Sequence, residues 1–417
     1  MKAKKLGILG IAGALVLGYA GVSKAGVELK AGENSKVDLG VWTQVNYTYK
    51  AKRENSGDSE NVISVKDMRV TLDGELTKNV QFYGDIVSED GNGFNLEEGG
   101  INIVINPYAE VRIGKVVVPF TRQQLVSSYY SIVPSGFLYD VQNIYNNDAL
   151  MKSGDGVGPA SIIAPENAGA ILHGEFADGI VRYSIGLFNQ ETREDKTNNG
   201  FGIVGRIEIT PVTFGFKPAP QNEINGWEKD TYFGKEGNIL TFGVGVYRTT
   251  LIDQNAELWR VGGVTIYAPD DLVLTGWTGD VFGEFKVPGS PVIINVAGSY
   301  IYLKNSHYYL DNNPKKGDTN IYTVQLQGLY DQAVGFGKPA IFFMYQGAKA
   351  DYVNSGKSDA TYSRFGVGIN YYIKGDALKA TLGLDNVKYD DAAEAYLNSA
   401  QKKDSITDIY AQIQLQF

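Results

Sequence analysis

The sequence predicts an all-β protein: a 16-stranded antiparallel transmembrane β-barrel with an inward-folded third extracellular loop. Three observations lead to this fold class. Apolar and polar residues alternate in many segments, the links between these segments are alternately short and long, and the composition is rich in Gly and Tyr but has no Cys. Alternation with a period of two gives a strand one apolar and one polar face, as a barrel with lipid outside and water inside requires.

The last segment, residues 405–417, shows the alternation most clearly. From Ile409 to Phe417 apolar side chains occupy every second position, and Tyr410 and three Gln occupy the positions between them. A strand of a soluble sheet with one face on a core has the same pattern, so this segment alone leaves both classes open. We interpret Phe417 as the barrel-terminal aromatic residue.

The first 25 residues are predicted to be a cleaved secretory signal peptide, which leaves residues 26–417 as the barrel domain. Three of the first five residues are Lys, residues 6–19 form an apolar run, and small residues occupy the peptidase positions in Ser23–Lys24–Ala25. The alternative is an uncleaved anchor helix. No later segment has about 18 consecutive apolar residues, so the exported protein is expected either in soluble form in the periplasm or outside the cell, or as a β-barrel in an outer membrane. The sorting of the links described below favours the bacterial outer membrane.

Sixteen alternating segments follow one another along the chain. They are residues 37–50, 62–76, 79–89, 99–106, 108–117, 168–176, 180–189, 200–210, 238–250, 272–287, 291–304, 320–332, 339–348, 360–374, 377–389 and 405–417. Residues 259–268 could form a further strand.

The links between the segments fall into two classes when the first strand begins on the periplasmic side. The periplasmic links are short, at 77–78, 106–107, 177–179, 288–290, 335–337 and 375–376. The outward links are longer and polar, at 51–61, 90–98, 118–167, 190–199, 251–271, 305–319, 349–359 and 390–404. An even number of strands with sorted links is typical of bacterial outer-membrane barrels. The link 211–236 is an exception, because it is long where a short link is expected.

A barrel of this size predicts a channel. No strand edge can remain unpaired in lipid, so the sheet closes on itself. With sixteen strands the lumen is too wide for wall side chains to fill, so it holds water unless something plugs it. The long link 118–167 is rich in apolar and aromatic residues, among them Phe120, Tyr129 and Tyr130. We therefore expect it to fold inward as a constriction loop, and the alternative is a mobile outer cap.

The segment RIGKVVVPFTRQQLVSS, residues 112–128, resembles the segment after the fifth strand in the phosphate-selective porin O/P family. The shared pattern is a strand ending in Gly, then Lys, then Pro-Phe and a Ser-containing stretch. The segments VWTQVNYTYK and DMRVTLDGELTKNVQFYGD also resemble the first three strands of that family. The resemblance implies a homotrimeric outer-membrane porin whose third loop leaves the wall at Pro119 and Phe120.

The inward-facing positions predicted from the alternation mix both charge signs. The predicted lumen-lining charges are Arg69, Arg112, Arg182, Arg206, Arg364, Lys379, Asp67, Asp73, Glu75, Glu110, Glu175, Glu208 and Glu284. The candidates for the pore constriction are Lys115, Arg122, Pro119 and Phe120. Family members specialised for phosphate use many Arg and a ring of Lys. A mixed lumen instead favours diffusion of ions and small hydrophilic solutes, with anions such as phosphate possible. Alternatively, each charge only solvates a wet wall.

Other classes of function have little support in the sequence. The chain has two His and no Cys, so we expect no metal site, no cofactor and no enzymatic activity. A net charge of −9 argues against a nucleic-acid partner. The expected partners are outer-membrane lipid, small ions and solutes, and two further copies of the chain in a homotrimer. The alternative from another class is a closed barrel that acts as an adhesin or surface structural protein.

Overall fold

The computed structural model describes residues 27–30, 35–51, 59–89, 91, 93–134, 166–189, 200–222, 224–252, 254–255, 257–261, 264–309, 313, 315–351, 359–391 and 405–417. The predicted signal peptide and residues 135–165 of the long link lie outside this part. Among these described residues, no helix is both long enough and apolar enough to cross a membrane.

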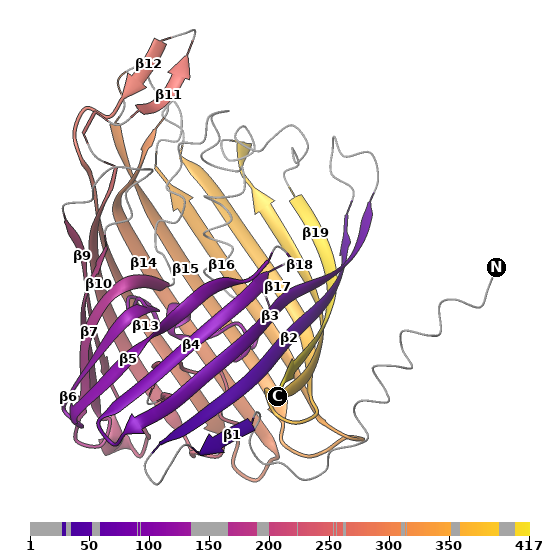
Figure 1. Ribbon diagram of the computed structural model, residues 1–417. Coiled ribbons are helices and arrows are strands. Elements are labelled where there is room, and N and C mark those ends of the chain that lie inside the picture. The colour runs from indigo at the N-terminus through magenta and orange to yellow at the C-terminus, as the bar shows by residue number, and fades with distance from the viewer. Residues whose placement is uncertain are drawn as a thin grey trace.

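Sixteen strands of the described chain close into one antiparallel barrel (Figure 1). The first nine are β2 (Lys36–Lys50), β3 (Glu60–Thr77), β4 (Val80–Glu89), β5 (Asn95–Asn106), β6 (Ala109–Val117), β7 (Glu166–Phe176), β8 (Val181–Asn189), β9 (Phe201–Ile209) and β10 (Ile239–Ile252). The other seven are β13 (Leu272–Lys286), β14 (Val292–Tyr309), β15 (Lys315–Tyr330), β16 (Lys338–Ala350), β17 (Ala360–Tyr372), β18 (Leu378–Tyr389) and β19 (Ser405–Gln416). This confirms the predicted fold class.

The barrel closes between its last and first strands. β19 pairs with β2 in a register that places Gln414 opposite Gln44, and the Gln44 amide donates to Gln414 Oε1 at 3.1 Å. Phe417 and Val41 exchange both backbone hydrogen bonds, at 2.7 and 2.9 Å. A short strand, β1 (Val27–Lys30), pairs with the beginning of β2. The predicted terminal aromatic residue therefore ends the seam of the barrel.

The two faces of each strand have opposite chemistry. On β9, for example, Ile207 is 53% exposed on the outer face, whereas its neighbours Arg206 and Glu208 are 5% and 4% exposed on the inner face. A soluble protein would bury the aliphatic side chains and expose the charged ones. The reversed arrangement fits a sheet with hydrocarbon outside and a polar lumen inside.

Three predicted outward loops differ in the structure. In the loop 305–319, β14 continues to Tyr309 and β15 already begins at Lys315. Residues 95–98 belong to β5 instead of the acidic loop, because Asp85 and Glu98 continue the β4–β5 ladder. Residues within 259–268 form strands, but β11 (Glu257–Val261) and β12 (Val264–Tyr267) make a separate hairpin that stands beyond the barrel rim (Figure 1).

Candidate functional site

The first residues after β6, residues 118–134, cross the inside of the barrel. The Phe120 ring packs 5.7 Å from the Tyr247 ring of β10, between centroids. The Tyr129 hydroxyl donates to Asp67 Oδ1 of β3 at 2.9 Å, and the Ile132 carbonyl accepts from Asn370 Nδ2 of β17 at 2.9 Å. These strands lie on different sides of the barrel, so the segment spans the lumen. We call it the crossing segment.

Hydrogen bonds between neighbouring residues fix the backbone at the beginning of the crossing segment. Thr121 caps the short helix α2 (Arg122–Leu125) with a capping box. The Gln124 amide N–H donates to Thr121 Oγ1 at 3.2 Å, and the Thr121 N–H donates to Gln124 Oε1 at 3.0 Å. The wall also makes room for the segment, since a Cβ on Gly245 would lie 2.1 Å from the Phe120 carbonyl oxygen.

Polar side chains of the last three strands hold the end of the crossing segment. Gln414 Nε2 donates to the Tyr129 carbonyl and Lys379 Nζ donates to the Ser131 carbonyl, each at 2.8 Å. Next to them, Ile132 and Val133 pack in an apolar cluster with Phe342, Met344 and Tyr410. The end of the crossing segment therefore lies against β16–β19.

The exceptional link 211–236 also folds into the lumen, and this accounts for its length. We call it the inward link. Its anchor is Glu284 of β13, whose carboxylate accepts from Thr231 Oγ1 at 3.0 Å and from the N–H groups of Tyr232 and Gly234 at 2.8 Å each. Phe233 and Gly234 have φ angles of 58° and 65°. Consecutive left-handed residues turn backbone N–H groups toward one anion, which is how this turn holds the carboxylate.

Arg122 joins the crossing segment to the inward link. Its Nε lies 3.1 Å from Glu228 Oε2 and its Nη1 lies 2.9 Å from Asp230 Oδ1, while Nη2 donates to the Lys229 carbonyl at 2.6 Å. The guanidinium carbon also lies 3.8 Å from the centroid of the Phe282 ring. Burial lowers the pKa of Arg122, but the two carboxylates outweigh burial and raise the pKa above its ordinary value. Arg122 is therefore charged in this contact, which we call the clasp.

Backbone and apolar contacts extend this clasp. The Glu228 N–H donates to the Leu125 carbonyl at 2.7 Å, and the Asp230 N–H donates to the Tyr130 carbonyl at 3.2 Å. Trp227 packs with Leu125, and its indole N–H donates to Glu98 of β5. The two inward segments thus form one body, which we call the constriction body.

The structure separates the four predicted constriction residues. Pro119, Phe120 and Arg122 belong to the crossing segment, but Arg122 is 2% exposed and its charge is taken up by the inward link. Lys115 shares a face of β6 with the exposed Ile113, and its amine donates to the Leu96 carbonyl at 2.7 Å. Lys115 therefore lies away from the constriction body.

The predicted lumen-lining charges occupy inward-facing positions. Most of the arginines are held by acidic side chains. Arg69 contacts Asp67, Asp85 and Glu97; Arg182 contacts Glu175 and Glu208; Arg206 contacts Glu208 and Asp280; and Arg364 contacts Asp385. The acidic partners on the inward link, Glu228 and Asp230, were not predicted from the sequence. The sequence marks them only by three consecutive charged residues, 228–230, inside a link of unexplained length.

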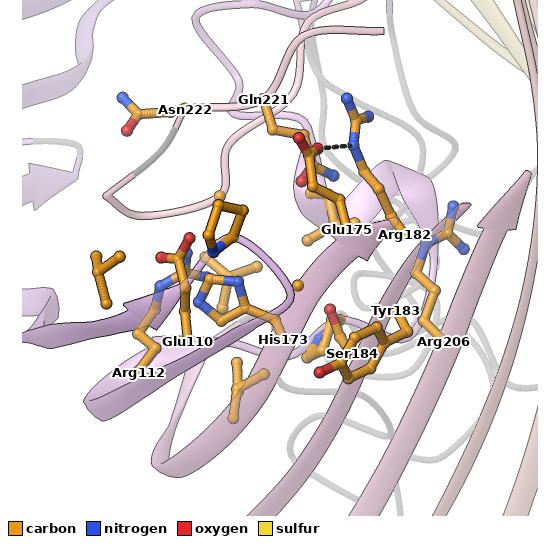
Figure 2. A pocket seen from close by; sticks show the side chains of 18 of the residues that line it. Glu110, Arg112, His173, Glu175, Arg182, Tyr183, Ser184, Arg206, Gln221 and Asn222 are labelled. Atoms are coloured by element: carbon orange, nitrogen blue, oxygen red, sulfur yellow. Dashed lines mark hydrogen bonds and ion pairs between the residues drawn. The ribbon is translucent and has the colours of Figure 1, made fainter. Parts of the chain in front are cut away.

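A cavity of about 670 Å³ remains between the constriction body and the wall formed by β3–β9. Figure 2 shows Glu110, Arg112 and His173 on one side of it, Glu175, Arg182 and Arg206 on the other, and Gln221 and Asn222 of the inward link above them. Lys78 and Pro107 of two short links also line the cavity, so it extends to the short-link end of the barrel. It is polar and carries both charge signs.

Comparisons with known proteins agree with this architecture. No protein-family model matches the chain. A protein of Aquifex aeolicus (strain VF5), described as uncharacterized, is 25% identical over 291 residues, which are 67% of this chain and 61% of that protein. The chain thus matches about three-fifths of that relative's length.

Several solved outer-membrane structures have a similar backbone. An anion-selective porin from Comamonas acidovorans has a TM-score of 0.56 and 17% sequence identity, and the match covers 92% of this chain and 100% of that one. OmpT of Vibrio cholerae in its trimer form has a TM-score of 0.54 and 12% identity, and the match covers 92% of this chain and 100% of that one. The outer-membrane channel DcaP of Acinetobacter baumannii has a TM-score of 0.52 and 13% identity, with 94% of this chain and 100% of that one covered. At such low identities the likeness establishes the fold: this chain has the barrel architecture of bacterial outer-membrane porins.

Proposed function

We propose that the protein is an outer-membrane porin, a water-filled channel for passive diffusion of ions and small hydrophilic solutes. The observation that carries the proposal is the charged cavity beside the constriction body, inside a closed barrel with an apolar outer face. A polar lumen across a lipid layer offers dissolved ions a path of low energy. The proposed activity is diffusion and involves no catalysis.

Further observations support the finer parts of the proposal. The order of strands and the Pro119–Phe120 departure support a relationship to the phosphate-selective porin O/P family. The paired charges of both signs in the cavity support a general pore more than a phosphate-specific one. Export through a cleaved signal peptide and assembly as a homotrimer complete the proposal, and the solved trimer form of OmpT supports the latter by analogy.

The alternative, a closed-barrel adhesin or surface structural protein, has one observation in its favour. The crossing segment contacts β3, β10 and β17 and so occupies much of the lumen. Liposome swelling separates the two functions. We expect liposomes containing the folded protein to swell in isotonic solutions of small sugars, and more slowly as sugar size increases. Swelling no faster than that of protein-free liposomes would favour the closed barrel.

A further inference from the structure

Arg112 differs from the other lumen-facing arginines that the structure describes. Arg69, Arg122, Arg182, Arg206 and Arg364 each lie within ion-pair distance of an acidic side chain. Arg112 is 6% exposed and lines the cavity, yet among the described residues it has no such partner. A buried guanidinium without a counter-ion is costly to fold, so its presence calls for a compensating anion.

The inward link holds Arg112 by one edge. Arg112 Nε donates to the Ile224 carbonyl at 2.9 Å. The guanidinium rests on Gly226, where a Cβ would lie 2.8 Å from Nη1, and the φ of 81° at this position also favours glycine. The described residues provide no hydrogen-bond acceptor for the two terminal nitrogens. The two terminal nitrogens, which we call the fork of the guanidinium, are thus held in place without an acceptor among the described residues.

Glu110 and Glu98 act on Arg112 only from beyond ion-pair distance, and both are hydrogen-bonded to other side chains. Asn102 Nδ2 donates to Glu110 Oε2 at 2.7 Å and to Gln81 Oε1 at 2.9 Å. The Asn102 oxygen therefore accepts a hydrogen bond from His173 Nε2 at 3.1 Å. This contact places the ring proton of His173 on Nε2. This network binds Glu110 through an amide and leaves Arg112 without its carboxylate.

The chemistry of the guanidinium decides what it can bind. Its two terminal nitrogens carry N–H donors at the edge of one planar group. This geometry matches two oxygens of a carboxylate or a phosphate group.

We propose that the part of the cavity next to Arg112 is an oxyanion subsite, in which a carboxylate or phosphate group of a small solute binds the two terminal nitrogens of Arg112. The subsite rests on the proposed porin function, since it lies on the diffusion path. It would favour entry of small oxyanions into a lumen whose other arginines are already neutralised by acids.

Block of chloride current in planar bilayers tests the subsite. Acetate and inorganic phosphate are added in separate series to channels recorded in potassium chloride. We expect at least one oxyanion to reduce the current with saturation, and Arg112→Gln to raise its half-blocking concentration about tenfold. Arg112→Lys, which keeps the charge but loses the fork, should give an intermediate value. The matched control is Lys78→Gln, which removes an exposed positive charge at the same cavity and should change the value less than twofold.

The series identify the ligand and can overturn the proposal. Block by acetate alone assigns the subsite to carboxylates, and block by phosphate alone assigns it to phosphates. No block by either anion, or equal block in wild type and Arg112→Gln, would overturn it. If Arg112→Gln loses its β-sheet circular dichroism, Arg112→Lys carries the same comparison.

Calorimetric titration of acetate and phosphate into the folded, detergent-solubilised protein separates this proposal from the porin function. Saturable binding that Arg112→Gln weakens would support the subsite even if the wild-type protein conducts no current. The lack of current would contradict only the porin function. A conducting wild type with no Arg112-dependent binding or block would contradict only the subsite.

Discussion

Arg122 Nε lies 3.1 Å from Glu228 Oε2, although the two residues come from links that leave opposite ends of the barrel. The contact joins the crossing segment and the inward link into the constriction body. Because both side chains are almost fully buried, the pair has to be kept together: separating it would leave charges without partners in a place that water reaches poorly.

Replacing Arg122 by Gln should loosen the constriction body. Glu228 and Asp230 would remain buried without their counter-ion, a loss of about 3–5 kcal/mol in the free energy of unfolding. We expect higher single-channel conductance with more current noise, and a lower urea midpoint for unfolding in phospholipid vesicles. Lys115→Gln is the matched control, because Lys115 lies outside the constriction body. Equal effects of both substitutions would contradict this assignment.

Glu284 should be needed to hold the inward link. Glu284→Gln keeps one acceptor oxygen but loses the charge that binds Thr231, Tyr232 and Gly234. The expected loss is about 2–3 kcal/mol in unfolding free energy, together with faster proteolysis of the link in the folded protein. Glu75→Gln at the half-exposed pair with Lys36 should cost well under about 1 kcal/mol. A Glu284→Gln protein as stable and protease-resistant as wild type would refute the anchor.

Gly245 should be needed for close approach of the crossing segment. A Val side chain there would overlap the Phe120 carbonyl, so the segment has to shift away from β10. We expect a destabilisation of about 1–3 kcal/mol and altered conductance. Gly279→Val on β13 is the control, since a Cβ at Gly279 meets no atom within 4 Å. The same unfolding midpoint for both variants would place the segment elsewhere.

Asp376, in the short link between β17 and β18, should make stability depend on pH. Burial raises its pKa to about 6 from the ordinary 3.8, against the opposing effects of Lys379 and Lys229. A raised pKa means that the folded protein prefers the protonated acid. The contribution of protonated Asp376 to the free energy of unfolding is therefore complete below about pH 3.8, and it is lost as pH rises through about 6.

Asp376→Asn should therefore stabilise the protein at pH 8 and have little effect at pH 3.5. The upper bound on the gain is about 3 kcal/mol, from a shift of about two pKa units. Urea unfolding at the two pH values measures it. Asp331→Asn, at a half-exposed pair with Lys338, should not show a gain. A stabilisation by Asp376→Asn that is equal at both pH values would contradict the buried, titrating acid.

The barrel could be predicted from the sequence because its cause is local. Lipid outside and water inside impose a period of two on each strand, and tight turns mark where strands end. The strand parity also placed Glu110 and Arg112 inside the lumen. The same parity places Lys115, within the predicted strand 108–117, on the outer face, so its assignment to the constriction did not follow the alternation.

The constriction body could not be predicted from the sequence. Arg122 and Asp230 are 108 positions apart, and nothing in a single sequence pairs them before the barrel is closed. The inward turn of residues 231–234 depends on a carboxylate from a different strand, Glu284. The length of the link 211–236 signalled an exception, but only its contacts explain it.

Stepwise conductance of single wild-type channels in a planar lipid bilayer tests the central claim most directly. Purified, folded protein should insert in discrete steps of equal current, and a salt gradient across the bilayer should give a reversal potential that reports the preferred ion sign. Folded protein that inserts into the bilayer but leaves the membrane electrically silent would contradict the account of an open, water-filled lumen.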